Sequence, residues 1–145
     1  MRNLTSRSSA LILVLFVAFG CTSTEERYAT AEQLADQGLY QEATGEYIRV
    51  LEKDENFPGA RAGLAEAGGI LVEEYVSYAR ESADREQYAE ASETLDMADR
   101  IRSRARGVRV NIAVPEDYGR FRMSVDRSAV EELTLLAQSQ SERGN

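Results

Sequence analysis

The stretch QGLYQEATGEYIRVLEKDENFPGA, residues 37 to 60, decides how this chain folds. After its first glycine it carries apolar residues at the spacing of one helix face: Tyr40, Ala43, Tyr47, Val50 and Leu51. This spacing predicts a helix that starts near Tyr40 and stops around residues 54 to 57, before Pro58, which suits the first turn of the next helix. Residues 26 to 37 show a helical pattern too, and Gly38 is suited to end that helix in a left-handed conformation. The stretch therefore predicts two helices joined by a tight turn.

Two short amphipathic helices cannot each bury an apolar face alone, so the pair is expected to pack antiparallel and to need a neighbour. Residues 24 to 57 resemble one tetratricopeptide repeat. The residues that match the family's small, turn, aromatic and core positions are Ala31, Gly38, Tyr40, Ala43, Tyr47 and Leu51, and Ala60 and Leu64 match the start of a following repeat. The resemblance implies an all-α array of stacked helix pairs, with a groove that binds protein or peptide segments.

A second copy of the pattern follows at the same internal spacing: Ala79, Tyr88, Ala91, Leu95 and Ala98. Glu86 stands where Gly38 stood, and a non-glycine residue with positive φ costs about 1 kcal/mol, so this turn is expected to use residues 83 to 85 differently. Tyr88 follows Tyr40 by 48 residues, whereas the family's period is about 34 residues. The excess predicts one long helix over residues 58 to 83 in an irregular array.

Tyrosines at the repeat positions 40, 47 and 88 are expected to pack between helices. Tyr75 and Tyr78 are candidates to line the concave face, where such repeats bind peptides.

After Arg106 the period changes. Valine and isoleucine alternate with other residues over 108 to 114, which is typical of a strand or extended segment that lies on the helices, pairs with a partner or reflects composition alone. Helix is expected to resume near Val125, with a capping box of Ser128 and Glu131 and with an apolar face made of Val130, Leu133, Leu136 and Ala137. This terminal helix matches the spacing of residues 30 to 39, so it is interpreted as the first helix of an incomplete repeat in a truncated chain. A natural end capped by the polar residues Gln138, Gln140 and Glu142 is the alternative.

The N-terminus has the layout of a secretory signal, because Arg2 and Arg7 precede an apolar run from Ala10 to Gly20. The run has 11 residues, about half of the roughly 20 that a membrane-spanning helix needs. Cys21, the only cysteine, stands where the run stops, and AFGC resembles the lipobox of bacterial lipoprotein signal peptides. An uncleaved anchor or a buried thiol is the alternative interpretation of this segment.

The lipoprotein resemblance implies that Cys21 is the first mature residue and carries lipid as an anchor. Thr22 follows it instead of the Asp that retains Gram-negative lipoproteins in the inner membrane, so the resemblance favours an outer-membrane protein facing the periplasm. The predicted organisation is a signal peptide, a repeat domain, an irregular insertion and a terminal helix: residues 1–20, 21–106, 107–124 and 125–145. Neither the partner nor the oligomeric state follows from this pattern.

The composition argues against catalysis. The chain has no His and no Trp, and its one Cys is assigned to lipid, so the usual triad and metal motifs cannot be built and neither cofactor nor metal is expected. Carboxylate pairs such as Glu73 and Glu74 are interpreted as solvated helix faces. The net charge of -8 disfavours nucleic acid as a partner. An anchoring segment for an enzyme domain beyond residue 145 is the least favoured alternative.

Charge is unevenly distributed along the chain. Residues 21 to 99 contain 19 acidic and 6 basic residues, whereas residues 100 to 145 contain 6 acidic and 9 basic ones. The basic cluster consists of Arg100, Arg102, Arg104, Arg106 and Arg109. It either complements the dipole at a helix C-terminus or forms a patch for anionic lipid, cell-wall polymer or an acidic partner. The second reading gives the alternative function, a structural envelope lipoprotein.

Overall fold

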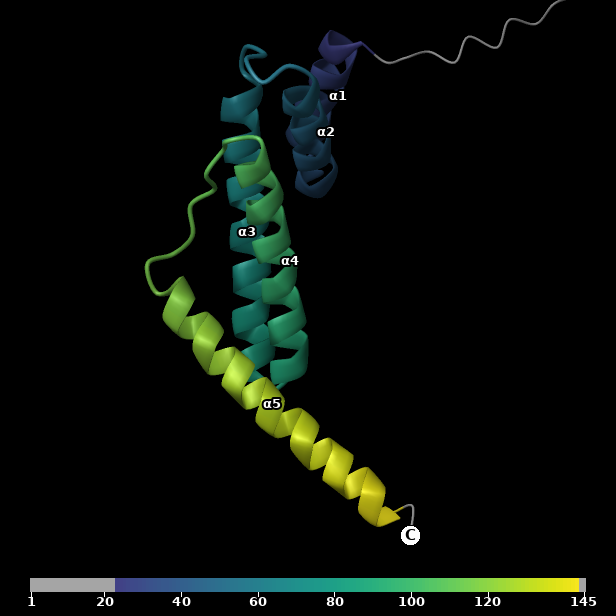
Figure 1. The fold of residues 1–145 in the computed structure, drawn as a ribbon, viewed down its shortest axis with the longest axis vertical. Helices are drawn as coiled ribbons and strands as arrows, with labels where there is room; N and C mark the ends of the chain where they lie inside the picture. Colours follow the sequence, from purple (N-terminus) through teal and green to yellow (C-terminus); the bar gives the residue numbers. More distant parts are fainter. Residues whose placement is uncertain (1–22, 144–145) are drawn as a thin grey trace, which may run out of the picture.

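A computed structural model describes residues 23 to 143 of the chain, and within that range the fold is all-α. The signal peptide and Cys21 lie outside the described residues. Five helices follow one another: α1 (Thr24–Asp36), α2 (Tyr40–Lys53), α3 (Ala60–Asp84), α4 (Tyr88–Gly107) and α5 (Tyr118–Arg143). Each helix packs on the next one in the chain, and the long α3–α4 pair forms the centre of the molecule (Figure 1).

The turn between α1 and α2 forms as the sequence predicts. Gly38 has a φ of 74° and follows the C-cap residue Gln37. The Leu39 N–H donates to the Leu34 carbonyl at 2.9 Å, and the Gly38 N–H donates to the Ala35 carbonyl at 2.9 Å. These two bonds satisfy helix-end carbonyls and turn the chain back on itself. At the other end of α1, Ser23 and Glu26 form a capping box that the sequence analysis did not identify.

The turn between α3 and α4 has the same geometry, so the expected use of residues 83 to 85 in a different turn was wrong. Glu86 takes the glycine position with a φ of 63°. Its N–H donates to Ala83 and the Gln87 N–H donates to Ser82, both at 2.9 Å. The hydrogen bonds and the packing of the two helices hold Glu86 in a conformation that costs a residue with a Cβ about 1 kcal/mol.

Replacing Glu86 with Gly is expected to raise the free energy of unfolding by about 0.5 to 1 kcal/mol, because glycine adopts positive φ without the steric penalty. Gly38→Ala is the matched opposite change. No atom lies within 4 Å of a Cβ added at Gly38, so that variant tests backbone strain alone and should lose about 1 kcal/mol. Urea unfolding measures both. Two shifts of the same sign would contradict this description of the turns.

Helix α3 begins at Ala60, two residues later than predicted. Gly59 is its N-cap with a φ of 80°, so Pro58 lies in the preceding turn instead of the first helical turn. A Cβ at Gly59 would also overlap the Tyr28 hydroxyl, so both the positive φ and the lack of space favour glycine at this position. The predicted length of this helix is confirmed, because α3 continues without interruption to Asp84.

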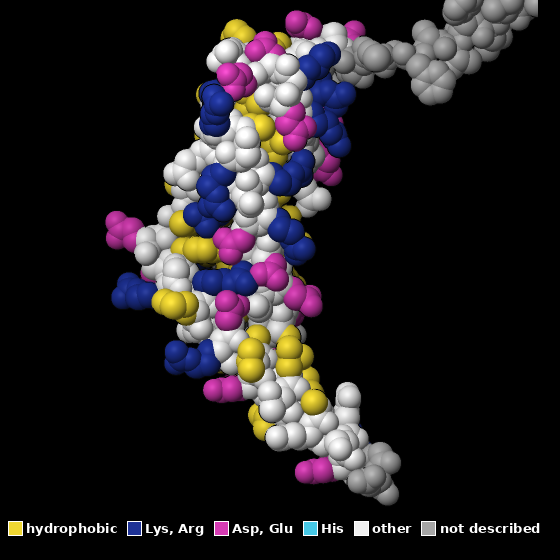
Figure 2. Space-filling view, viewed as in Figure 1, with side chains coloured by type: hydrophobic (Ala, Val, Ile, Leu, Met, Phe, Trp, Pro, Cys, Tyr) yellow, Lys and Arg dark blue, Asp and Glu magenta, His cyan; other side chains and the backbone are white. Residues whose placement is uncertain are grey.

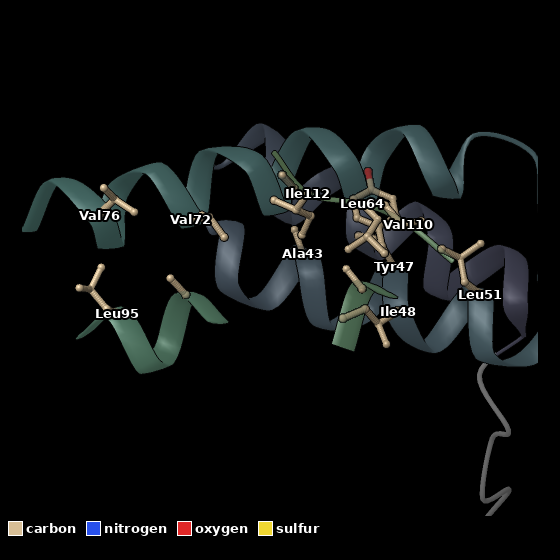
Figure 3. Packing of buried hydrophobic residues seen from close by; sticks show 14 of the residues in the cluster. Ala43, Tyr47, Ile48, Leu51, Leu64, Val72, Val76, Leu95, Val110 and Ile112 are labelled. Carbon is tan, nitrogen blue, oxygen red and sulfur yellow. The ribbon is translucent and has the colours of Figure 1, made fainter. Parts of the chain in front are cut away.

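The core lies between α2, α3 and α4, as Figure 3 shows for Ala43, Tyr47 and Leu64. Small residues allow the helices to approach closely. A Cβ at Gly63 on α3 would lie 2.6 Å from Cε1 of Tyr47 and 2.7 Å from its hydroxyl oxygen. Tyr47 is only 3% exposed and packs edge-on against Tyr28, with 5.9 Å between ring centroids. A larger residue at 63 must therefore displace this ring from its packing against Tyr28.

Alanine substitutions at two glycines of α3 are expected to have opposite signs. Gly69→Ala should raise the free energy of unfolding by about 0.5 to 1 kcal/mol, since no atom lies within 4 Å of the new Cβ and alanine favours helix. Gly63→Ala should lower it by about 1 to 3 kcal/mol, because the added methyl group overlaps the Tyr47 ring. Thermal or chemical unfolding of both variants measures the difference. Stabilisation by Gly63→Ala would mean that Tyr47 does not lie over α3.

The segment after α4 forms no strand, so that part of the prediction was wrong. Arg109 has a φ of 60° and ends α4 with a third turn of the same type, and residues 110 to 115 have no regular secondary structure. Val110 and Ile112 are nevertheless buried. Gly68 makes room for Ile112, because a Cβ there would lie 2.5 Å from the Ile112 Cδ1 atom. The alternating apolar residues thus cover the helices, which is one of the three arrangements that the sequence left open.

Helix α5 begins at Tyr118, seven residues before the predicted start at Val125, so Ser128 and Glu131 lie inside the helix and do not cap it. The early start follows from packing, because Tyr118 is buried and its hydroxyl lies 3.5 Å from the Leu95 carbonyl oxygen. Arg122 joins α5 to α4 by ion pairs with Asp96 and Asp99. Tertiary contacts therefore set this boundary.

The docked part of α5 ends near Glu132. Its Oε2 atom accepts a hydrogen bond of 2.9 Å from the Ala89 N–H, which caps the N-terminus of α4. Beyond this point α5 extends past the ends of α3 and α4 (Figure 1). Large apolar residues from Val130 onward are about half to two-thirds exposed: Val130, Leu133, Leu135 and Leu136. The predicted apolar face is therefore present on a helix, but in the described residues nothing covers it.

Candidate functional site

A groove of about 770 Å³ lies between α1, α2 and α3. Tyr28, Tyr40 and Tyr47 contribute its aromatic surface. Gly59 and Gly63 line it from the side of α3 and leave the space that the tyrosine rings occupy. The groove exists because α1 and α3 both pack on α2 while making few contacts with each other. Its floor is therefore α2, and its walls are the first and third helices.

Three carboxylates surround the groove and no basic side chain lines it. Glu32 and Asp36 come from α1 and Glu66 comes from α3, and all three side chains are exposed to solvent. None of them forms an ion pair within residues 23 to 143. This distinguishes them from Glu46, which pairs with Arg27 and Arg49 on another side of α2. The groove consequently has an uncompensated negative charge.

Tyr47 is the most deeply placed polar side chain of the groove. Its ring reaches from α2 toward α3 (Figure 3), and its hydroxyl forms no hydrogen bond with any residue of the described part of the chain. Burial raises the pKa of Tyr47 to about 12, and the nearby Tyr28, Glu32, Glu66 and Asp36 act in the same direction. The phenol therefore stays neutral and keeps both a hydrogen-bond donor and an acceptor free in the groove.

The repeat positions named from the sequence are distributed as core residues. Gly38 lies in the first turn, and Tyr40 and Tyr88 are half-buried at the starts of α2 and α4. The remaining positions are buried: Ala31, Ala43, Tyr47, Leu51, Ala79, Ala91, Leu95 and Ala98. Sequence reasoning did not identify Tyr28, Glu32 or Glu66 as groove residues. The signal that would have found the acidic pair is its position on the outer faces of the first and third predicted helices.

Tyr75 and Tyr78 do not line this groove. The Tyr75 hydroxyl donates to Gln41 at 2.9 Å, and the Tyr78 hydroxyl donates to Glu90 at 2.6 Å. Tyr75 instead borders a second groove of about 490 Å³ between α2 and α4, together with Met97, Arg100 and Arg104. Both tyrosines thus stabilise contacts between neighbouring helices through their hydroxyl groups.

The structure does not gather the five arginines into one patch. Arg102 is paired with Asp99 at 3.0 Å and lies 5.3 Å from the centre of the Tyr118 ring, whereas Arg109 is paired with Glu55 at 3.0 Å. Arg100 lies between the other two arginines of α4: it lines the groove between α2 and α4 with Arg104, and it lines a surface depression beside Asp96 and Asp99 with Arg106. Basic and acidic side chains accordingly alternate over this surface (Figure 2). Two of the five cations are used in contacts between structural elements.

The described residues contain no arrangement suited to metal binding, since no three His, Cys, Asp or Glu side chains come together in a way that could hold an ion. Over the same range, no helix has the length and apolar character that crossing a bilayer requires.

Comparison of the chain with models of protein families, with curated proteins and with solved structures finds no match.

Proposed function

We propose that this chain is a tetratricopeptide-like interaction module, held at a bacterial envelope membrane by lipid on Cys21, that binds an extended polypeptide segment in the groove between α1, α2 and α3. The single observation that carries the proposal is this groove, which is open, lined by three tyrosines and bordered by unpaired carboxylates. The module acts by presenting a shaped surface, without catalysis, and its activity is binding.

The arrangement of the helices supports the comparison with tetratricopeptide repeats. Two successive helix pairs, α1–α2 and α3–α4, close with the same hydrogen-bonded turn, in which Gly38 and Glu86 hold equivalent places. Alanines at equivalent positions, Ala43 and Ala91, are fully buried where each pair packs. The long α3 and the irregular segment after α4 depart from a regular array. The proposal is therefore one of similar helix pairing with an unequal period.

A pair of tryptophan variants on α3 tests the role of the groove. Ala62 is exposed and lines the groove, whereas Ala65 is exposed on the same helix but lies outside it. Envelope proteins that are photo-crosslinked to the wild-type protein should be lost with Ala62→Trp and retained with Ala65→Trp. Equal crosslinking by both variants would show that binding occurs elsewhere. Binding to anionic vesicles that is lost when Arg100, Arg104 and Arg106 become Gln would favour the alternative envelope function.

The lipid anchor is tested separately at Cys21. Cys21→Ser removes the only thiol of the chain, so the variant should remain uncleaved or appear in the soluble fraction, while the wild-type protein partitions with membranes. Mass spectrometry of the wild-type N-terminus should show a lipid-modified cysteine. A wild-type preparation with an unmodified Cys21 that behaves as a soluble protein would contradict the anchor and leave the groove proposal unaffected.

A further inference from the structure

We infer that the groove between α1, α2 and α3 selects a cationic segment and holds the ammonium group of a lysine side chain among Glu32, Asp36, Glu66 and the Tyr47 hydroxyl. This inference rests on the proposed function and adds the chemistry of the ligand. It is carried by two independent observations, which are the charge that borders the groove and the unused hydroxyl group at its floor.

The first observation is electrostatic. Three carboxylates border the groove, they come from two helices that are far apart in the sequence, and none has a basic partner among residues 23 to 143. Six acidic side chains outside the groove are compensated by arginine: Glu46, Glu55, Asp96, Asp99, Asp117 and Asp126. Arg122, for example, pairs with Asp96, Asp99 and Asp126. A groove with uncompensated negative charge attracts cationic ligands and weakens the binding of acidic segments.

The second observation is the Tyr47 hydroxyl. Tyr47 lines the groove and is only 3% exposed. Its hydroxyl has no hydrogen-bond partner in the part of the chain that the structure describes. The hydroxyl oxygen is not sealed from solvent, because the fully buried side-chain atoms without a partner in the described residues are Thr44 Oγ1 and Arg102 Nε. A ligand atom in the groove can therefore reach it. Because the phenol remains protonated, its oxygen can accept a hydrogen bond from an ammonium group.

The shape of the groove suits a lysine side chain. The rings of Tyr28, Tyr40 and Tyr47 offer apolar surface for the methylene groups and aromatic faces for the cation, and a lysine ammonium group has three donors for carboxylates on different walls. An apolar side chain of the same length would leave the Tyr47 hydroxyl unpaired. An acidic side chain would lie next to three like charges.

The experiment compares three Gly/Ser-rich peptides that carry lysine, acetyl-lysine or glutamate at the same positions. The full chain in nonionic detergent is titrated with each peptide by calorimetry, and the amide signals of Gly59 and Gly63 report occupation of the groove. We expect the lysine peptide to bind at least about tenfold more tightly than the acetylated one, with an affinity that falls as salt is added. The glutamate peptide should not bind.

Two triple variants separate a local effect from the loss of net charge. Glu32→Gln, Asp36→Asn and Glu66→Gln together should weaken lysine-peptide binding about tenfold or more, and Tyr47→Phe should weaken it by roughly threefold to tenfold. The control is Glu81→Gln, Glu93→Gln and Glu116→Gln, which removes the same charge from exposed positions outside the groove and should change the affinity less than about twofold. Unfolding curves of all variants verify that the fold is retained.

Equal binding of the lysine and acetyl-lysine peptides in the groove would overturn the inference and leave the proposed function standing. Equal weakening by both triple variants would also overturn it, because the effect would then be one of net charge. If no peptide of any charge shifts the amide signals of Gly59 or Gly63, the proposed function and this inference fail together.

Discussion

Replacing Ala43 with Arg is expected to lower the free energy of unfolding by about 3 kcal/mol or more, which is a large part of the 5 to 15 kcal/mol typical of a domain. Ala43 is fully buried in the α2 face that packs on its neighbours, and Ile48, Tyr47 and Leu51 surround the same side of the helix. An arginine there adds volume to a filled core and brings a cation into it without a partner. Urea unfolding followed by circular dichroism measures the loss.

Ala65→Arg is the matched control for this change. Ala65 lies on α3, also in a helix, but its side chain is exposed, so the same substitution should alter stability by less than about 0.5 kcal/mol. Equal unfolding curves for Ala43→Arg and the wild-type protein would show that α2 does not pack through this face. The α1–α2 pairing, and with it the floor of the groove, would then be wrong.

Amide hydrogens in the distal part of α5 should exchange at least about a hundredfold faster than those around Tyr47 to Leu51. The residues of α2 are buried, and their amides exchange only when most of the structure opens. Leu133, Leu135 and Leu136 are exposed by 54%, 66% and 48%, and apolar side chains gather there on the surface of the projecting helix (Figure 2). A helix without tertiary contacts opens at little cost in free energy, and each 1.4 kcal/mol of difference changes protection about tenfold.

The first part of α5 provides an internal control for the exchange measurement. Val125 and Ala129 are buried, and Arg122 holds this part of the helix to α4, so their amides should be protected nearly as well as those of α2. Uniform protection along the whole of α5 would contradict the expectation. It would mean that another surface, such as a second copy of the chain, covers Leu133 and Leu136 in solution.

The helices that the sequence predicts well are those in which local signals and burial agree. Gly38 ends α1 because glycine alone adopts its φ without strain, and the spacing of Ala43, Tyr47 and Leu51 gives α2 a single buried face. The long α3 is also predictable, because the sequence between Ala60 and Asp84 contains no proline and its only turn signal is the pair Gly68-Gly69, which does not interrupt the helix.

Where the predictions were wrong, tertiary contacts outweighed local preference. Glu86 adopts a positive φ because the packing of α3 on α4 fixes a turn whose backbone conformation suits glycine better. Helix α5 begins early because Tyr118 and Arg122 pack on α4. The alternation of Val110 and Ile112 reflects burial on the helices, where Gly68 leaves space, instead of pairing in a sheet. Periodicity records which side chains are buried, and it does not specify what buries them.

The sequence by itself determined the all-α class, the turn at Gly38 and most of the buried residues, because these depend on the spacing of apolar side chains and on backbone preferences within one or two turns. Only the tertiary structure decided the groove. Tyr28, Glu32 and Glu66 are distributed over two helices, and their common environment exists because α1 and α3 both pack on α2. The same holds for the arginines of α4. Arg102 is turned toward Tyr118 on α5, whereas Arg100 stays beside Arg104 and Arg106.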